Sequence, residues 1–135
     1  MNLVYKCPHC NASINAKRNI ILAAESVHNK SKKGLVLLHE EIGNYTVAMS
    51  SSLTIDNGEE VNFFCPVCNE SLNNMQGDNL ASFTRIDEAG EESTIVISRI
   101  YGERCTFQVD DKKQVKSYGE SVQKYLNPEW FLRQE

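Results

Sequence analysis

Two Cys-Pro-x-Cys-Asn motifs constrain this chain more than any other feature of its sequence. The first contains Cys7 and Cys10, and the second contains Cys65 and Cys68. Together they supply four thiolates, which is the number of ligands that a tetrahedral metal site needs. The proline in each motif fixes φ before the turn, and the asparagine after each second cysteine suits a left-handed residue at its end.

Neither motif can complete a tetrahedron alone. We therefore predict that Cys7, Cys10, Cys65 and Cys68 bind one structural Zn²⁺ and that the ion joins two halves of the chain. The free energy of metal binding then contributes to folding. Because sulfur fills all four positions, none stays open for water, so the pattern favours a structural ion over a catalytic one.

The motifs belong to a longer internal repeat. Sliding the sequence by 58 residues superposes the two cysteine pairs and also places Leu22 on Leu80, Leu37 on Ile95 and Val47 on Cys105. We expect a duplication, with a first zinc-knuckle β repeat in residues 1–58 and a second in residues 59–110. Residues 111–135 fall outside it.

Each repeat has the sequence pattern of β-structure, with β-branched residues, alternation and turns that contain glycine. Strands are expected at residues 3–5, 20–26, 35–41, 45–51, 61–64, 80–86, 94–100 and 104–109. A short C-terminal helix is expected from apolar residues spaced by three and four, namely Val115, Tyr118, Val122 and Tyr125. The predicted fold class is all-β, mostly antiparallel, with that helix and an internally duplicated zinc-ribbon-like domain around one four-cysteine zinc site.

The two motifs and the strands around them resemble the zinc-ribbon class of proteins and, more distantly, rubredoxin. Zinc ribbons are generally structural binding modules in transcription, translation and other assemblies. Rubredoxins hold iron on a similar set of four thiolates and carry one electron. The resemblance implies one structural Zn²⁺, with iron as the alternative metal.

Composition narrows the function. The net charge of −4 argues against general affinity for nucleic acid. No apolar run is long enough to span a membrane, and the early first cysteine leaves no room for a signal peptide, so we expect a cytoplasmic protein with reduced thiols. No enzyme is expected, because His9, His28 and His39 are interpreted as ordinary surface or strand residues and Cys105 as a buried strand thiol.

Two further groups of residues could contact partners. A basic group could face RNA phosphate or an acidic protein; it consists of Lys17, Arg18, Lys30, Lys32 and Lys33. An apolar tail contains Trp130, Phe131 and Leu132, and the sequence leaves open whether it folds back over the sheet or anchors a partner.

The function predicted from the sequence is a non-catalytic, zinc-stabilised binding or regulatory module. It would present β-hairpins to a protein partner within a larger complex, and matched faces would also allow a homodimer. One alternative is a zinc-ribbon protein that associates with RNA or the ribosome. Another is a rubredoxin-like iron electron carrier.

Overall fold

A computed structural model describes residues 3–29, 31–50, 53, 55–73, 80–103, 105–112 and 114–119. This part of the chain forms ten strands and contains no helix, and so none that is long and apolar enough to cross a membrane. All strand pairs are antiparallel. The predicted all-β, mostly antiparallel fold is confirmed.

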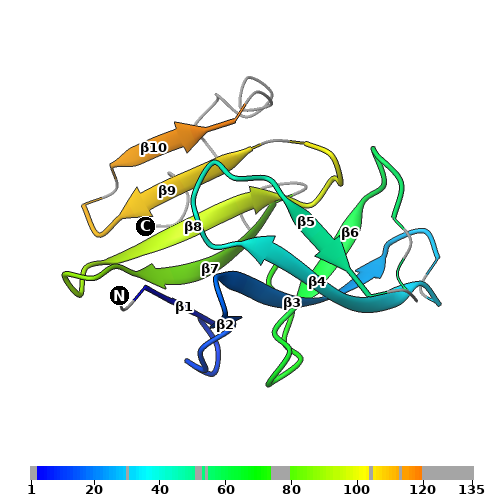
Figure 1. Cartoon of the computed structure of the whole chain (residues 1–135), viewed down its shortest axis with the longest axis horizontal. Coiled ribbons are helices and arrows are strands. Elements are labelled where there is room, and N and C mark those ends of the chain that lie inside the picture. The colour runs from blue at the N-terminus through cyan, green and yellow to red at the C-terminus, as the bar shows by residue number, and fades with distance from the viewer. Residues whose placement is uncertain are drawn as a thin grey trace.

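The strands form two sheets, which Figure 1 shows side by side. Sheet A has the order β1-β7-β8-β9-β10 and consists of β1 (Val4–Lys6), β7 (Leu80–Ile86), β8 (Glu92–Ser98), β9 (Thr106–Asp110) and β10 (Val115–Tyr118). Sheet B has the order β2-β3-β4-β5, with β6 also paired to β3, and consists of β2 (Asn15–Ala16), β3 (Asn19–Ser26), β4 (Lys33–His39), β5 (Val47–Met49) and β6 (Val61–Phe64).

The strand that leads into each cysteine motif joins the sheet built mainly by the other half of the chain. β1, from the first half, pairs with β7, with Tyr5 opposite Arg85. β6, from the second half, pairs with β3, with Phe63 opposite Ala24. The two halves are therefore crossed over each other, and each sheet is completed by a strand from the other half.

The main core lies between the two sheets. Strict alternation along β3 sends Ile20, Leu22 and Ala24 inward, as the period of two in a strand requires. They pack in one cluster with inward residues of sheet A such as Phe83 and Ile95. A second buried cluster lies on the opposite face of sheet A and contains Leu80, Val96, Cys105 and Phe107.

The pairing register relates the two halves by offsets that differ from the constant 58 residues expected from the sequence. Leu22 pairs with Val36, and Phe83 pairs with Ile95, with all four side chains buried. The structural equivalent of Leu22 is thus Phe83, whereas Leu80 faces the other side of its sheet. A longer connection after the second motif causes the shift, because a displacement by an odd number of residues reverses the face of a strand.

The C-terminal prediction is wrong where the structure describes it. Val115–Tyr118 form strand β10, paired with β9, instead of the first turn of a helix. The Asp110 carboxylate accepts hydrogen bonds from the backbone N–H groups of Lys112 and Gln114, both at 2.9 Å, and so closes a tight turn. The open edge of β9 then pairs with the returning chain and overrides a weak helical periodicity. Val122, Tyr125 and the apolar tail lie outside the described residues.

Candidate metal centre

Both cysteine motifs form the same tight turn. The N–H of Asn11 donates to the carbonyl of Cys7 at 2.9 Å, and the N–H of Asn69 donates to that of Cys65 at the same distance. Asn11 and Asn69 have φ angles of 62° and 65°, which confirms the left-handed asparagine expected at each turn. Asparagine tolerates this region better than most residues that carry a Cβ.

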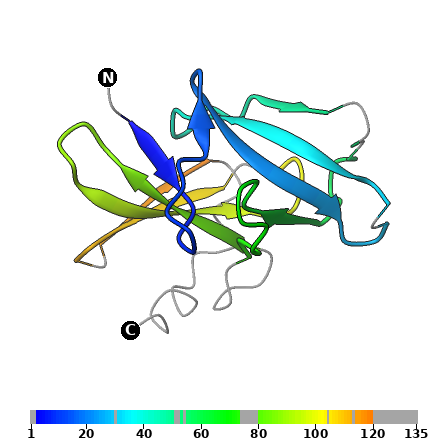
Figure 2. The same cartoon turned by 90° about the horizontal axis from the view of Figure 1, so that it is seen from below.

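The crossed lead-in strands bring the two turns side by side (Figures 1 and 2). The four sulfur atoms all lie within 4.8 Å of one another. Cys7 Sγ is 3.8 Å from Cys68 Sγ, and Cys10 Sγ is 3.8 Å from Cys65 Sγ. Sulfurs bonded at about 2.3 Å to a tetrahedral ion stand about 3.8 Å apart, whereas a disulfide needs about 2.05 Å. The cluster therefore fits a metal ion and could hold one.

Backbone N–H groups point at the sulfurs. The N–H of His9 donates to Cys7 Sγ at 3.3 Å, and those of Val67 and Cys68 donate to Cys65 Sγ at 3.3 and 3.4 Å. Burial alone would raise the pKa of the Cys65 thiol, but the N–H groups of Cys68 and Val67, together with the thiols of Cys7 and Cys68, bring it down to about 7. This sulfur is thereby prepared to become a thiolate, the form that binds metal.

The thiols of Cys7 and Cys68 have raised pKa values. Burial raises the pKa of Cys7. The backbone N–H of Glu70 favours the thiolate of Cys68, but burial and the neighbouring sulfurs of Cys65, Cys7 and Cys10 together raise its pKa to about 12. A cation at the centre would reverse this repulsion, because a bound metal deprotonates its thiol ligands.

The structure reveals a role for His9 that the sequence did not. His9 Nε2 lies 3.0 Å from the carbonyl oxygen of Ser71, so a side chain of the first motif reaches the backbone that follows the second. Its counterpart in the second motif, Val67, is 66% exposed. The only signal in the sequence was the position of His9 between two cysteines, which predicts proximity to the site but not this hydrogen bond.

Cys105 is buried, as predicted, and stands apart from the cluster. It lies one residue before β9, in the second apolar cluster on sheet A. Burial and, secondarily, the charge of Glu103 raise the pKa of its thiol to about 12. A protonated buried thiol is a poor nucleophile and a poor metal ligand.

The described members of the predicted basic group do not form one patch. Lys17 and Arg18 occupy the turn before β3, and Lys32 and Lys33 follow its far end. A strand of this length separates the two pairs by about 25 Å. Lys32 is also paired with Glu59, 3.2 Å away. Lys30, Trp130, Phe131 and Leu132 lie outside the described residues.

Four sulfurs from two sequence-distant motifs are thus the chemical centre of the described structure. Soft thiolate ligands in a tetrahedral set suit zinc and also iron. With four sulfurs on one ion, no ligand position would be open for water or substrate. Comparisons of this chain with protein-family models, with curated proteins and with solved structures gave no match.

Proposed function

We propose that this chain is a non-catalytic binding module whose fold is held together by one Zn²⁺ on Cys7, Cys10, Cys65 and Cys68. One observation carries the proposal: the four sulfurs, two from each half of the chain, lie within 4.8 Å of one another. An ion bound there would link the ends of the two lead-in strands, β1 and β6, through the cysteines that follow them. Its binding free energy stabilises the whole fold and leaves the loops free to carry recognition.

Duplication explains the arrangement. The bridges Lys6 to Ser13 and Phe64 to Ser71 match across the halves, and so do the order and direction of the following strands. We propose that residues 1–58 and 59–110 are copies of one β unit that pair through exchanged strands. The shared ion then lies on the axis that relates the copies.

The proposed partner is a protein that contacts the exposed side of the cysteine turns. Cys10 and His9 are exposed there, and Val67 presents a large apolar side chain to solvent. An RNA partner receives less support, since a phosphate backbone would have to bridge two basic pairs about 25 Å apart.

Metal analysis of the purified protein tests this proposal. We expect one zinc ion per chain, a colourless protein, and loss of the folded state when a strong chelator removes the zinc. Iron in place of zinc, with red colour and reversible reduction, would support the rubredoxin-like alternative instead. The Cys105→Ala variant is the matched control, because it removes a buried thiol outside the cluster. Full stability without any bound metal would overturn the proposal.

A further inference from the structure

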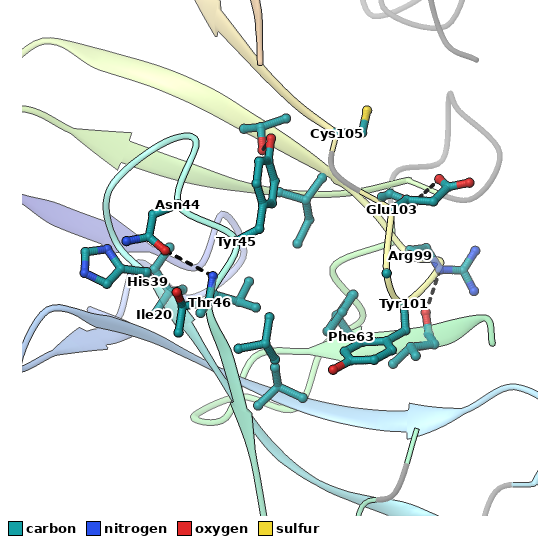
Figure 3. A pocket seen from close by; sticks show the side chains of 18 of the residues that line it. Ile20, His39, Asn44, Tyr45, Thr46, Phe63, Arg99, Tyr101, Glu103 and Cys105 are labelled. Atoms are coloured by element: carbon teal, nitrogen blue, oxygen red, sulfur yellow. Dashed lines mark hydrogen bonds between the residues drawn. The ribbon is translucent and has the colours of Figure 1, made fainter. Parts of the chain in front are cut away.

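A cavity of about 350 Å³ lies between the two sheets. Its two walls are the connection between β4 and β5 and the connection between β8 and β9, as Figure 3 shows. Tyr5 and Phe63, each two residues before a motif cysteine, contribute to its lining. Pockets that bind small ligands begin at about 300 Å³, so this cavity is large enough for a small organic molecule.

Equivalent residues of the two halves line the cavity. One such pair is Val36 and Ile95, which are both buried. Nearer the mouth, Leu38 and Ile97 occupy equivalent positions on β4 and β8 and are only half-buried, and Ile42 and Tyr101 precede the turns at Gly43 and Gly102. These half-buried side chains leave apolar surface exposed in the cavity. A ligand that covered this surface would gain about 25 cal/mol of binding free energy per Å² removed from water.

Three charged side chains line the cavity: Glu41 is exposed to solvent, Glu103 accepts a hydrogen bond from the Ser98 hydroxyl at 2.6 Å, and Arg99 is engaged by neighbouring groups. Arg99 donates to the carbonyl of Val61 and to Asn62, and it forms an ion pair with Glu60 at 3.1 Å. It therefore offers little to an anionic ligand, because binding one would break these contacts. The lining favours a neutral occupant.

Tyr45 and Tyr101 lie on opposite sides of the cavity (Figure 3). The Tyr45 hydroxyl donates to the carbonyl of Tyr118 at 3.0 Å and so accepts from the hydroxyl of Thr106 at 3.0 Å. The Tyr101 hydroxyl has no hydrogen-bond partner within the described ranges and points toward the hollow in Figure 3. Tyr101 is thus the polar group best placed to orient a ligand.

We propose that this cavity binds a small neutral molecule, mainly apolar and carrying one hydrogen-bonding group, with one or two aromatic rings or a short branched chain. The apolar body lies between Leu38 and Ile97, and its polar group meets the Tyr101 hydroxyl. The proposal is independent of the metal's identity and adds a small-molecule site to the proposed binding module.

Titration of the metal-loaded, full-length protein with N-phenyl-1-naphthylamine tests the site. This neutral probe has an apolar body and one N–H group, and its fluorescence rises when water is excluded. We expect saturable binding of one probe per chain with a micromolar Kd. Ile97→Trp fills the hollow and should weaken binding at least tenfold. Leu35→Trp, on β4 but 46% exposed and outside the lining, should bind the probe as the parent does.

Two further measurements keep the test decisive if Ile97→Trp folds poorly. Tyr101→Phe should weaken probe binding by about three- to tenfold, the usual effect of one hydrogen bond. Amide chemical-shift changes in the unaltered protein should centre on residues 38–47 and 97–103. Absence of saturable binding, or shifts centred elsewhere, would overturn the proposal. The metal content of each variant, measured in parallel, separates failure of this site from failure of the zinc proposal.

Discussion

The two halves of the molecule agree on their inward faces and differ on their outward ones. Inside, Leu22 and Phe83 occupy equivalent buried positions. Outside, Leu37 on β4 is only half-buried, whereas its equivalent on β8, Val96, is 0% exposed. Inward positions are constrained by the shared core and the sulfur cluster, whereas the outward faces of the two sheets have different surroundings.

The difference extends to the charged turns that follow β3 and β7. In the first half, Lys32 forms an ion pair with Glu59. In the second half, the Asp87 carboxylate closes its own turn by accepting hydrogen bonds from the N–H groups of Ala89 and Glu91, both at 2.9 Å. The first turn is therefore linked to Glu59 at the start of the second half, whereas the hydrogen bonds of Asp87 stay within the second turn.

Replacing one cysteine of either motif should cause the largest loss of stability, and the loss should be equal for the two motifs. Cys7→Ser and Cys65→Ser each remove one ligand, and we expect both to lose metal and more than about 5 kcal/mol of stability, because structural zinc sites contribute on the order of 10 kcal/mol. Metal content and urea unfolding measure this. Cys105→Ala should retain the metal and cost only about 1–2 kcal/mol. If either Cys7→Ser or Cys65→Ser stayed stable and kept its metal, the two halves would not contribute equally to the site.

A smaller effect should distinguish the outward faces. Val96→Ala creates a cavity in the buried cluster on sheet A, and we expect a loss of about 1–3 kcal/mol. Leu37→Ala, at the equivalent half-buried position, should cost less than about 1 kcal/mol even though it removes more atoms. Urea unfolding of both variants gives the comparison. Equal losses would mean that the outward faces are equally buried in solution.

Low pH should weaken the hydrogen bonds and the ion pair that the Glu59 carboxylate forms. The Ser26 hydroxyl, the Asp56 N–H and Lys32 all favour its ionised form and lower its pKa from 4.5 to about 2. A lowered folded-state pKa stabilises the protein above pH 4.5, and this stabilisation is lost as pH falls toward about 2.

Glu59→Gln should therefore flatten the dependence of the urea midpoint on pH between about 4.5 and 2. The difference in pH dependence between this variant and the parent reports the Glu59 carboxyl alone. Any effect of acid on the four cysteines is the same in both proteins. Glu91→Gln, in the equivalent turn of the second half, should leave the parent's slope intact. An unchanged slope in Glu59→Gln would show that these contacts of the Glu59 carboxylate do not form.

The smallest expected effect is a gain in stability from a substitution in the turn between β2 and β3. Lys17 and Arg18 form a two-residue hairpin turn with φ angles of 51° and 70°, a conformation that glycine adopts without the cost imposed by a Cβ. Arg18→Gly should raise the free energy of unfolding by about 1 kcal/mol. Thermal unfolding checks this, with Lys33→Gly, in an extended strand, expected to destabilise instead.

The sequence predicted the cysteine cluster well because the information that specifies each turn is local. Two cysteines, a proline and an asparagine specify each turn, and four thiolates specify the coordination number. It also predicted most strands, from β-branched residues, from alternation at Cys105, Phe107 and Val109, and from turns that contain glycine. It could not predict which half each lead-in strand would join, because pairing of Tyr5 with Arg85 depends on contacts far apart in the chain.

The errors have the same origin. Val115 and Tyr118 are compatible with either a helix or a strand, and the open edge of β9 decided between them. Leu80 was aligned with Leu22 because both are apolar, but the longer connection before β7 turned Leu80 to the other face. The cavity was invisible in the sequence because its lining comes from strands and turns throughout the chain.

The crossing of the lead-in strands has a consequence during synthesis. Val4–Lys6 must wait for Thr84 to Ile86 before they can pair. At about 5–20 residues per second, β1 spends on the order of ten seconds without its partner strand. The thiols of Cys7 and Cys10 are exposed to oxidants and stray metal ions for that time, so a nascent chain that stalls midway would be a natural substrate for chaperones.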